Sequence, residues 1–227
     1  MGRCPKEVSR IKKLQKQLKV LSPDIPEELT ELILDKKIRN EDYFEMGIIS
    51  DRVIASQIAE HVFFDKIIFK NVTFQQVDFS GVELTDVVFE KCDLSNVDFN
   101  EAMMHRVEMK DCKILGINLL GATLRNVLFD NCYGDYATFR NVNCKQVKFH
   151  NSSFANADFY TSTLLNVHFS NSNIEQIQLS GTKLAGIDLS SCEFRQIGVT
   201  MEDLQGCIVS PQQAVALSKL FGLIVNE

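Results

Sequence analysis

The chain has 227 residues, of which 45% are hydrophobic and 24% charged, and its formal net charge is −6. This negative charge disfavours direct binding to nucleic acid, because the phosphate backbone repels acidic surfaces. No apolar run approaches the roughly 18 residues of a membrane-spanning helix, and no signal peptide is recognisable. The sequence therefore predicts a cytoplasmic protein that does not associate with a membrane.

A helical extension is expected over residues 1–40. The apolar residues of its first helix recur at helical spacing: Val8, Ile11, Leu14, Leu18 and Leu21. The opposite face of that helix is basic: Arg3, Lys6, Arg10, Lys12, Lys13, Lys16 and Lys19. A second short helix is expected from Pro26, with Leu29, Leu32 and Ile33 as its apolar face. We interpret the extension as a cap with a solvated basic face; contact with an acidic partner or a membrane surface is the alternative.

Residues 41–61 are expected to form a transition into a repeat region. Phe44, Ile49 and Ile54 already keep the five-residue spacing of the repeats that follow. Arg52 and Gln57, however, occupy positions that hold small or β-branched residues further along the chain. This stretch is therefore predicted to be a poorly formed starting coil.

A five-residue period runs through most of the remaining chain. From Phe64 to Val199 every fifth residue is apolar, with the single exception of Gly134. Two residues before each of these 28 positions, from Val62 to Ile197, a second series contains only Val, Ile, Ala, Cys, Ser and Thr. A period of five fits neither a helix nor a strand, whereas a short fixed repeat indicates a solenoid.

The repeat resembles that of the pentapeptide-repeat family, whose consensus is a small residue, Asp or Asn, Leu or Phe, and two variable residues. It reads Val77-Asp78-Phe79-Ser80-Gly81, Cys92-Asp93-Leu94-Ser95-Asn96, Val97-Asp98-Phe99-Asn100-Glu101 and Ala157-Asp158-Phe159-Tyr160-Thr161. The resemblance implies an all-β solenoid, a right-handed quadrilateral β-helix with one pentapeptide on each side. Residues 62–201 would then make about seven coils, with residues such as Phe129, Phe149 and Phe169 stacked twenty apart.

Gly134 is the one central position of the repeats that lacks an apolar side chain for the predicted core. Tyr133 and Tyr136 flank it, so we expect a local distortion in which a tyrosine ring covers the gap. A functional bulge is one interpretation of such a site. The other is a tolerated defect, because a glycine also relieves crowding beneath large neighbouring rings.

The C-terminal residues 202–227 are expected to form a capping helix and a tail. Ser210 is the predicted N-cap, with Pro211 as the first helical residue and Gln213 as the capping-box partner. The segment resembles the C-terminal segment of the Qnr proteins of this family, which implies a homodimer. The implied interface residues are Leu217, Leu220, Phe221, Leu223 and Val225. Any amphipathic capping helix would show a similar pattern, which is the alternative.

No motif for catalysis, cofactor binding or metal binding is present. The sequence has no nucleophile elbow, phosphate-binding loop or HExxH motif, so no enzymatic activity is expected. Its seven cysteines include no CxxC pair, and Cys92, Cys112 and Cys132 fall in one column of the inner series. A straight column does not converge on a tetrahedral metal, so these cysteines are interpreted as small buried side chains.

The distribution of charge points to a protein partner. Residues 78–111 carry nine acidic and three basic side chains. The pentapeptide-repeat family includes the Qnr and MfpA proteins, which resemble B-DNA in width and charge and bind DNA gyrase. That resemblance implies a DNA mimic with these candidate contact residues: Asp78, Glu83, Asp98, Glu101 and Asp158. The alternative for the aspartates is structural, since an acid before the central residue belongs to the repeat consensus.

Three functions are consistent with these features of the sequence. The first is binding to DNA gyrase or topoisomerase IV in competition with DNA, with protection against quinolones. The second is a generic scaffold for protein–protein interaction whose partner engages the N-terminal helical extension. The third is a membrane-associated effector that uses the basic first helix.

Overall fold

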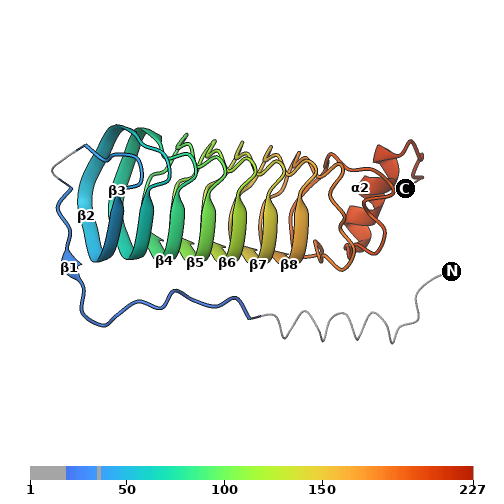
Figure 1. Ribbon diagram of the computed structural model, residues 1–227. Coiled ribbons are helices and arrows are strands. Elements are labelled where there is room, and N and C mark those ends of the chain that lie inside the picture. The colour runs from blue at the N-terminus through green and yellow to red at the C-terminus, as the bar shows by residue number, and fades with distance from the viewer. Residues whose placement is uncertain (1–18, 35–36, 227) are drawn as a thin grey trace.

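A parallel β-solenoid forms most of this computed structural model, which describes residues 19–34 and 37–226 (Figure 1). The strands of successive coils pair in parallel at an interval of twenty residues, as in Phe129 with Phe149. The strands that repeat once per coil are β2 (Tyr43–Ile58), β3 (Phe63–Asp78), β4 (Glu83–Glu90), β5 (Met103–Lys110), β6 (Thr123–Asp130), β7 (Asn143–His150) and β8 (Thr163–Ser170). The predicted all-β solenoid of about seven coils is confirmed.

A left-handed backbone conformation recurs at every fifth residue and makes the corners of the coil. At Asn126 and Asn131, for example, φ is 56° and 55°. Asparagine occupies nine of the described corners, and it tolerates this region better than most L-residues. Four such corners in twenty residues explain why one pentapeptide forms each side of the coil.

Phenylalanine rings fill the centre of the rod. The ring of Phe149 stacks between those of Phe129 and Phe169, with centroid distances of 5.0 and 4.7 Å and interplanar angles of 2° and 8°. This spacing matches that of hydrogen-bonded β-strands. The rings are at most 3% exposed, so the rod has a continuous apolar core even though each coil contacts only its neighbours.

The inner series of small residues supplies hydrogen-bond donors as well as space. The Sγ of Cys112 lies 3.4 Å from the carbonyl oxygen of Phe89, twenty-three residues earlier. The hydroxyls of Ser162 and Thr182 donate to the carbonyls of Phe139 and Phe159 in the same way, at 2.8 and 2.6 Å. The cysteines of this series are therefore buried structural side chains, and those described by the structure are unpaired thiols.

The N-terminal region differs from the expectation. The helix expected from Pro26 is wrong, because these residues are non-helical and lead into strand β1 (Thr30–Glu31), which pairs with Gly47 and Ile48 of β2. The side chain of Leu32 lies directly against Gly47, where any Cβ would collide with it. Most of the basic helix expected before it falls on residues 1–18, outside the described part of the chain, and its expected last turn at residues 19–21 is non-helical.

The starting coil is regular rather than poorly formed. Strand β2 pairs with β3 from Tyr43 to Ile58 in the same twenty-residue register as the later coils. The two unusual inner residues find polar partners at this open end: Arg52 contacts Glu31, and the Gln57 side chain accepts the Ile38 N–H at 2.9 Å. These contacts explain how long polar residues replace small ones in the first coil.

The coil at Gly134 is regular, and the expected tyrosine cover is wrong. Tyr133 and Tyr136 are 62% and 64% exposed and point away from the core. The ring of Phe154 in the next coil takes the space instead, since a Cβ on Gly134 would lie 2.5 Å from it. The glycine therefore makes room for a neighbouring ring, and its N–H keeps the coil-to-coil hydrogen bond to Ser153.

Replacement of one stacked ring tests how far the core determines stability. We expect Phe149→Ala to lower the free energy of unfolding by about 3–5 kcal/mol, because it leaves a cavity between two stacked rings. The exposed Tyr133→Ala is the control and should change it by less than about 0.5 kcal/mol. Urea unfolding followed by circular dichroism measures both, and equal effects of the two variants would contradict this account of the core.

Candidate functional site

Two predicted contact residues, Asp78 and Asp98, stack directly on one side of the rod. The Oδ1 of Asp78 accepts the Ser80 N–H at 3.1 Å, and that of Asp98 accepts the Asn100 N–H at 2.8 Å. The same two-residue turn recurs at Asp93, Asn118, Asn173 and Asp188. These carboxylates therefore stabilise the backbone turn, in agreement with the structural alternative, and are only half-buried.

The other predicted acids lie on different parts of the rod. Glu101 is on the same side of the coil as the stacked pair and is exposed at a corner with φ 58°, whereas Glu83 lies on the adjacent side, in strand β4. We call Asp78, Asp98 and Glu101 the acidic face. Asp158 is separated from it by the coils of Asn118 and Thr138.

Asp158 differs from the acidic face because a cation neutralises it. The guanidinium of Arg140 donates to its Oδ2 from Nε at 3.0 Å and from Nη2 at 2.7 Å. Arg140 also lies over the ring of Tyr160, 5.2 Å from the centroid. The structure thus places three of the five predicted acids on one side of two neighbouring coils, Glu83 on the adjacent side, and Asp158 in a local ion pair.

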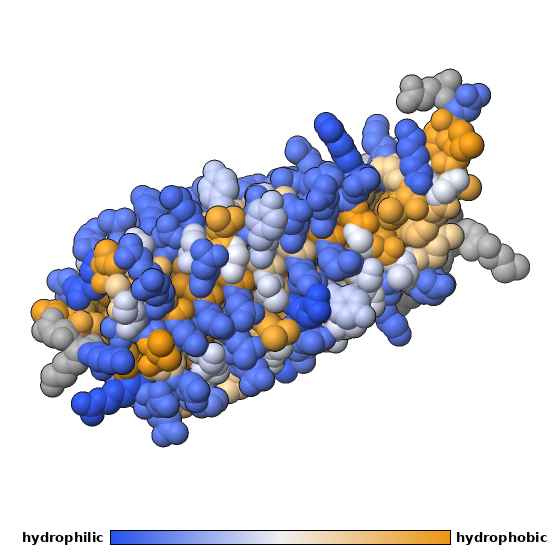
Figure 2. All heavy atoms as spheres, turned by 90° about the horizontal axis from the view of Figure 1, so that it is seen from above, coloured by the Kyte–Doolittle hydropathy of each residue, from blue (hydrophilic) through white to orange (hydrophobic). Residues whose placement is uncertain are grey.

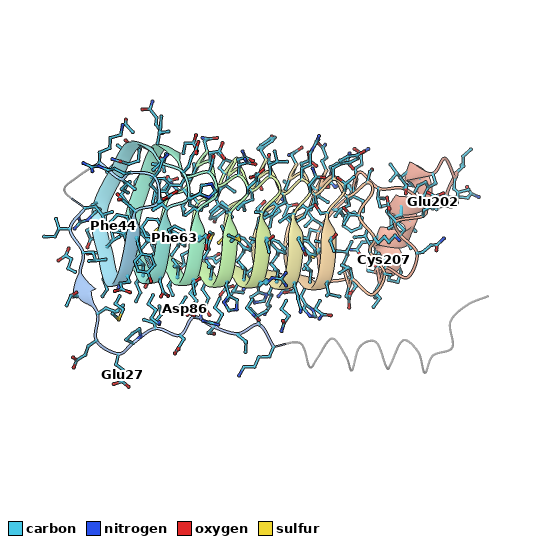
Figure 3. All side chains as sticks on the ribbon, viewed as in Figure 1. Glu27, Phe44, Phe63, Asp86, Glu202 and Cys207 are labelled. Atoms are coloured by element: carbon cyan, nitrogen blue, oxygen red, sulfur yellow. The ribbon has the colours of Figure 1, made fainter. Side chains whose placement is uncertain are left out.

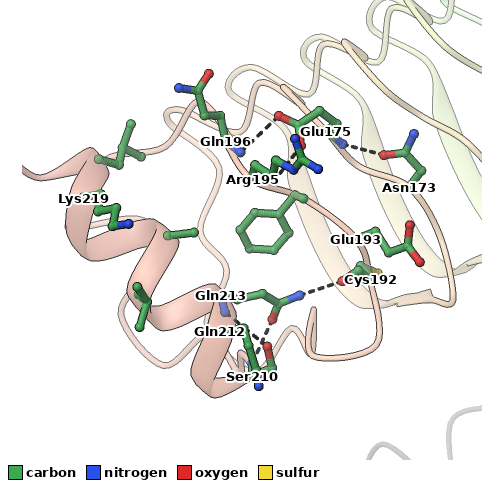
Figure 4. Close-up of a pocket in the computed structure, with 14 residues that line it drawn as sticks. Asn173, Glu175, Cys192, Glu193, Arg195, Gln196, Ser210, Gln212, Gln213 and Lys219 are labelled. Atoms are coloured by element: carbon green, nitrogen blue, oxygen red, sulfur yellow. Dashed lines mark hydrogen bonds between the residues drawn. The ribbon is translucent and has the colours of Figure 1, made fainter. Parts of the chain in front are cut away.

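Helix α2 (Pro211–Leu220) closes the C-terminal end of the solenoid (Figure 1). The predicted capping box is present, with Ser210 accepting the Gln213 N–H and Gln213 accepting the Ser210 N–H. The Gln213 amide also donates to the carbonyl of Cys192 at 2.8 Å (Figure 4). It donates to the carbonyl of Leu189 at 2.8 Å as well. Leu217 is 8% exposed and joins the core. This predicted dimer residue therefore packs within its own chain.

The residues after Leu217 leave an apolar surface at this end. Leu220, Leu223 and Ile224 are 44%, 63% and 98% exposed, and apolar side chains gather at this tip of the rod, whereas its long side is mostly hydrophilic (Figure 2). Beside them, a cavity of about 1160 Å³ opens between α2 and the last coils, lined by residues that include Glu175, Arg195 and Lys219 (Figure 4). The tip is therefore a second candidate contact surface.

A third surface was not anticipated from the sequence. Residues 19–34, which we call the strap, run as a largely extended chain along the outside of the solenoid (Figure 1). They follow four corner residues at twenty-residue intervals, which we call the corner column: Asp86, Arg106, Asn126 and Gln146. Glu27 projects from the strap, and Asp86 lies between the strap and the solenoid (Figure 3).

The corner column holds the strap through the strap's backbone. The N–H of Asp24 donates to the Oδ1 of Asp86 at 2.7 Å, and the N–H of Leu21 donates to the Oδ1 of Asn126 at 3.1 Å. The side-chain amide of Gln146 lies 3.4 Å from the carbonyl oxygen of Lys19. These contacts join residues that are 62 to 127 positions apart in the sequence. No local sequence pattern therefore predicts them.

Asp86, the acidic residue of the corner column, is tightly constrained. Its side chain is 2% exposed and forms a bidentate pair with Arg106, Nε–Oδ1 and Nη2–Oδ2 both at 2.5 Å. Burial raises the pKa of Asp86, but the hydrogen bonds from Arg106 and from the Asp24 N–H outweigh it and hold the pKa below its ordinary value. Asp86 is therefore charged at neutral pH and links two coils and the strap.

Other site types are absent from the described residues. No group of three His, Cys, Asp or Glu side chains in residues 19–34 and 37–226 is arranged to hold a metal ion. No helix within the described ranges is both long and apolar enough to cross a membrane.

The lowered pKa of Asp86 predicts a specific pH dependence of stability. We expect Asp86→Asn to cost about 2 kcal/mol at neutral pH, because it removes a charge-assisted bidentate pair. A depressed folded-state pKa stabilises above the unfolded value of about 3.9, so the difference from wild type should shrink as pH falls below that value. Urea unfolding from pH 7 to pH 3 measures it. Asp188→Asn is the control, and a pH-independent difference would contradict this role of Asp86.

The comparisons with known proteins agree with the architecture. Residues 82–159 match the family described as a pentapeptide repeat region. The chain is 47% identical over 209 residues to the uncharacterized protein YisX of Bacillus subtilis (strain 168), covering 92% of this chain and 99% of that protein. In fold it is similar to a trypsin-treated variant of QnrB1, a plasmid-mediated fluoroquinolone resistance protein, with a TM-score of 0.58, 20% identity, and 83% and 99% of the two chains covered. With its five-residue repeat wound into a parallel solenoid, the chain belongs to the pentapeptide-repeat family.

Proposed function

We propose that this protein is a non-enzymatic binding rod whose acidic face engages DNA gyrase or topoisomerase IV in place of DNA. The observation that carries the proposal is the absence of cations from this side of the rod over three coils. Its outward positions from residue 78 to 121 hold neither Lys nor Arg: Asp78, Ser80, Gly81, Asp98, Asn100, Glu101, Asn118, Leu120 and Gly121. The negative field of the three carboxylates on this side is therefore not cancelled locally.

The density of charge on the acidic face supports mimicry of DNA. Three carboxylates lie on two neighbouring coils, or ~10 Å of rod, which is one charge per ~3.3 Å. A single strand of B-DNA carries one charge per ~3.4 Å of helix axis. The acidic face is therefore comparable to one strand of a short duplex, although it extends over few coils.

Rigidity of the acidic face is a second support. Asp78 and Asp98 are fixed by the turn hydrogen bonds of Oδ1, and no hydrogen bond within the described chain reaches their Oδ2 atoms. Carboxylates that are already ordered lose little conformational entropy when a partner binds. Asp158 is left out of the proposed contact because Arg140 neutralises it.

A supercoiling assay tests the proposal directly. Purified protein should inhibit DNA gyrase, or relieve inhibition by a fluoroquinolone, and the triple variant Asp78→Asn, Asp98→Asn, Glu101→Gln should lose this effect. Asparagine keeps the Oδ1 acceptor that the turn needs and removes only the charge. The effect should weaken as salt screens the exposed carboxylates.

The control for this assay is Asp93→Asn with Asp188→Asn, which makes the same chemical change in the same kind of turn on other sides of the rod. This control should inhibit gyrase as the wild type does. No effect of wild-type protein on supercoiling or on drug-induced cleavage at high micromolar concentration would refute the proposed partner.

We further propose that the protein is a homodimer through its C-terminal tip. The support is the exposure of Leu220, Leu223 and Ile224 beside one another at the end of the chain, since apolar side chains grouped at a surface favour association. Phe221 and Val225, which are partly exposed, belong to the same proposed contact. Leu217 is not included because it is buried within its own chain.

Light scattering after size-exclusion chromatography tests the dimer. The wild type should elute with the mass of two chains, and the triple variant Leu220→Ser, Leu223→Ser, Ile224→Ser with the mass of one. Leu165→Ser, which removes a 52% exposed leucine from the side of the rod, is the matched control and should remain dimeric. A monomeric wild type at all accessible concentrations would contradict the proposed interface.

A further inference from the structure

The strap is an acidic segment that lies on a partly basic side of the rod. From residue 20 to 34 it contains four carboxylates, at Asp24, Glu27, Glu28 and Glu31, and no Lys or Arg. Glu31 pairs with Arg52 at 3.1 Å. Asp86 is the main cause of the raised pKa of Arg106, and the carboxylate of Asp24 adds to it. The strap is thus held partly by charge complementarity.

The spacing of the contacts suits an extended peptide. Leu21 and Asp24 are three residues apart, and an extended chain of three residues spans ~10 Å. Their acceptors, Asn126 and Asp86, are two coils apart, which is also ~10 Å. The corner column therefore presents hydrogen-bonding groups at the repeat of an extended backbone that lies parallel to the rod axis.

The corner column contacts the backbone of the strap and not its particular side chains. Two N–H groups and one carbonyl of the strap are bound, and any extended peptide offers the same groups. Selection for acidic residues would come from the cations alongside. Arg125 and Lys145 stack next to the column, are exposed, and form no ion pair within the described chain.

The strap is weakly attached compared with the coils. No residue from 19 to 34 is fully buried, whereas the stacked rings of the core are at most 3% exposed. Strand β1, the Leu32 N–H bond to the Ile48 carbonyl at 2.7 Å, and the packing of Leu32 and Leu34 against the core anchor the C-terminal end of the strap. Over residues 19–29 the attachment consists of three side chain–backbone hydrogen bonds. Segments with so few buried contacts open at low free-energy cost.

We propose that the corner column is a docking site for an extended, acidic peptide segment of a partner protein, and that the strap occupies it until that segment displaces it. The site lies at the corner in the middle of strands β4 to β7, and one side of the coil separates it from the side that carries Asp78 and Asp98. Its existence does not depend on binding to gyrase. The tethered strap competes at a high effective concentration, so the partner segment binds only when it offers more contacts or more charge than the strap.

Fluorescence anisotropy with a labelled peptide of the strap sequence, residues 19–34, tests this proposal on the full-length protein. The variant Leu21→Pro, Asp24→Pro removes both N–H donors of the tethered strap and leaves the corner column intact. We expect it to bind the peptide at least about tenfold more tightly than the wild type does, because its own strap competes less. Ser22→Pro is the matched control, since the N–H of Ser22 makes no hydrogen bond within the described chain, and it should behave as the wild type.

Two further variants locate the site and its charge preference. Adding Asn126→Gly to the strap-weakened protein should abolish peptide binding, because glycine accepts the positive φ but cannot accept the Leu21 N–H. Asn166→Gly, at the equivalent corner two coils beyond Asn126 and outside the corner column, should leave binding unchanged. A peptide with its four acids replaced by Asn and Gln should bind about tenfold more weakly, the effect of several exposed ion pairs.

Three results would overturn the proposal. The first is equal peptide affinity, or none, in the wild type and the strap-weakened variant. The second is a neutral peptide that binds as tightly as the acidic one. The third is an increase in mass with protein concentration that disappears in the strap-weakened variant and persists in the variant of the C-terminal tip. That result would mean that the corner column binds the strap of a second copy of this chain.

Discussion

Hydrogen bonding between successive coils holds the chain in a twenty-residue register, and the other features of the molecule depend on it. The register places Phe129, Phe149 and Phe169 in one stack and puts a left-handed residue at each corner. A shift of one residue in any coil would turn inward side chains outward. Because each coil is bonded only to its neighbours, surface residues twenty apart also form straight columns, and both the acidic face and the corner column arise in this way.

The sequence predicted this register well because the signal is repeated 28 times and each inward position has the same requirement. The ends of the rod lack that redundancy. The spacing of Leu29, Leu32 and Ile33 fits a helix. The chain instead pairs with the open edge of the first coil as strand β1. At Gly134 the five-residue pattern shows that a central apolar side chain is missing. It does not show that the ring of Phe154 in the next coil fills the space.

The candidate surfaces were predictable to different degrees. Asp78 and Asp98 could be assigned to one side by counting, since the period fixes the direction of every side chain. That Arg140 would neutralise Asp158 depends on side-chain conformations across eighteen residues, which a period does not determine. The position of the strap could not be predicted from the sequence. Single hydrogen bonds, such as that from Leu21 to Asn126, produce no periodic pattern of residues.

The contact between the strap and the corner column also limits how such a rod can change in length. Solenoids grow or shrink by whole coils, and an insertion of five residues would rotate every later side by a quarter turn. One added coil lengthens the column by ~4.8 Å, which corresponds to about one and a half residues of extended chain. The strap can lengthen only by whole residues. Duplication of the coils that it crosses therefore keeps its hydrogen bonds only when two coils are gained together with three residues of the strap. Beyond Gln146, where the described contacts of the strap end, coils can be added one at a time.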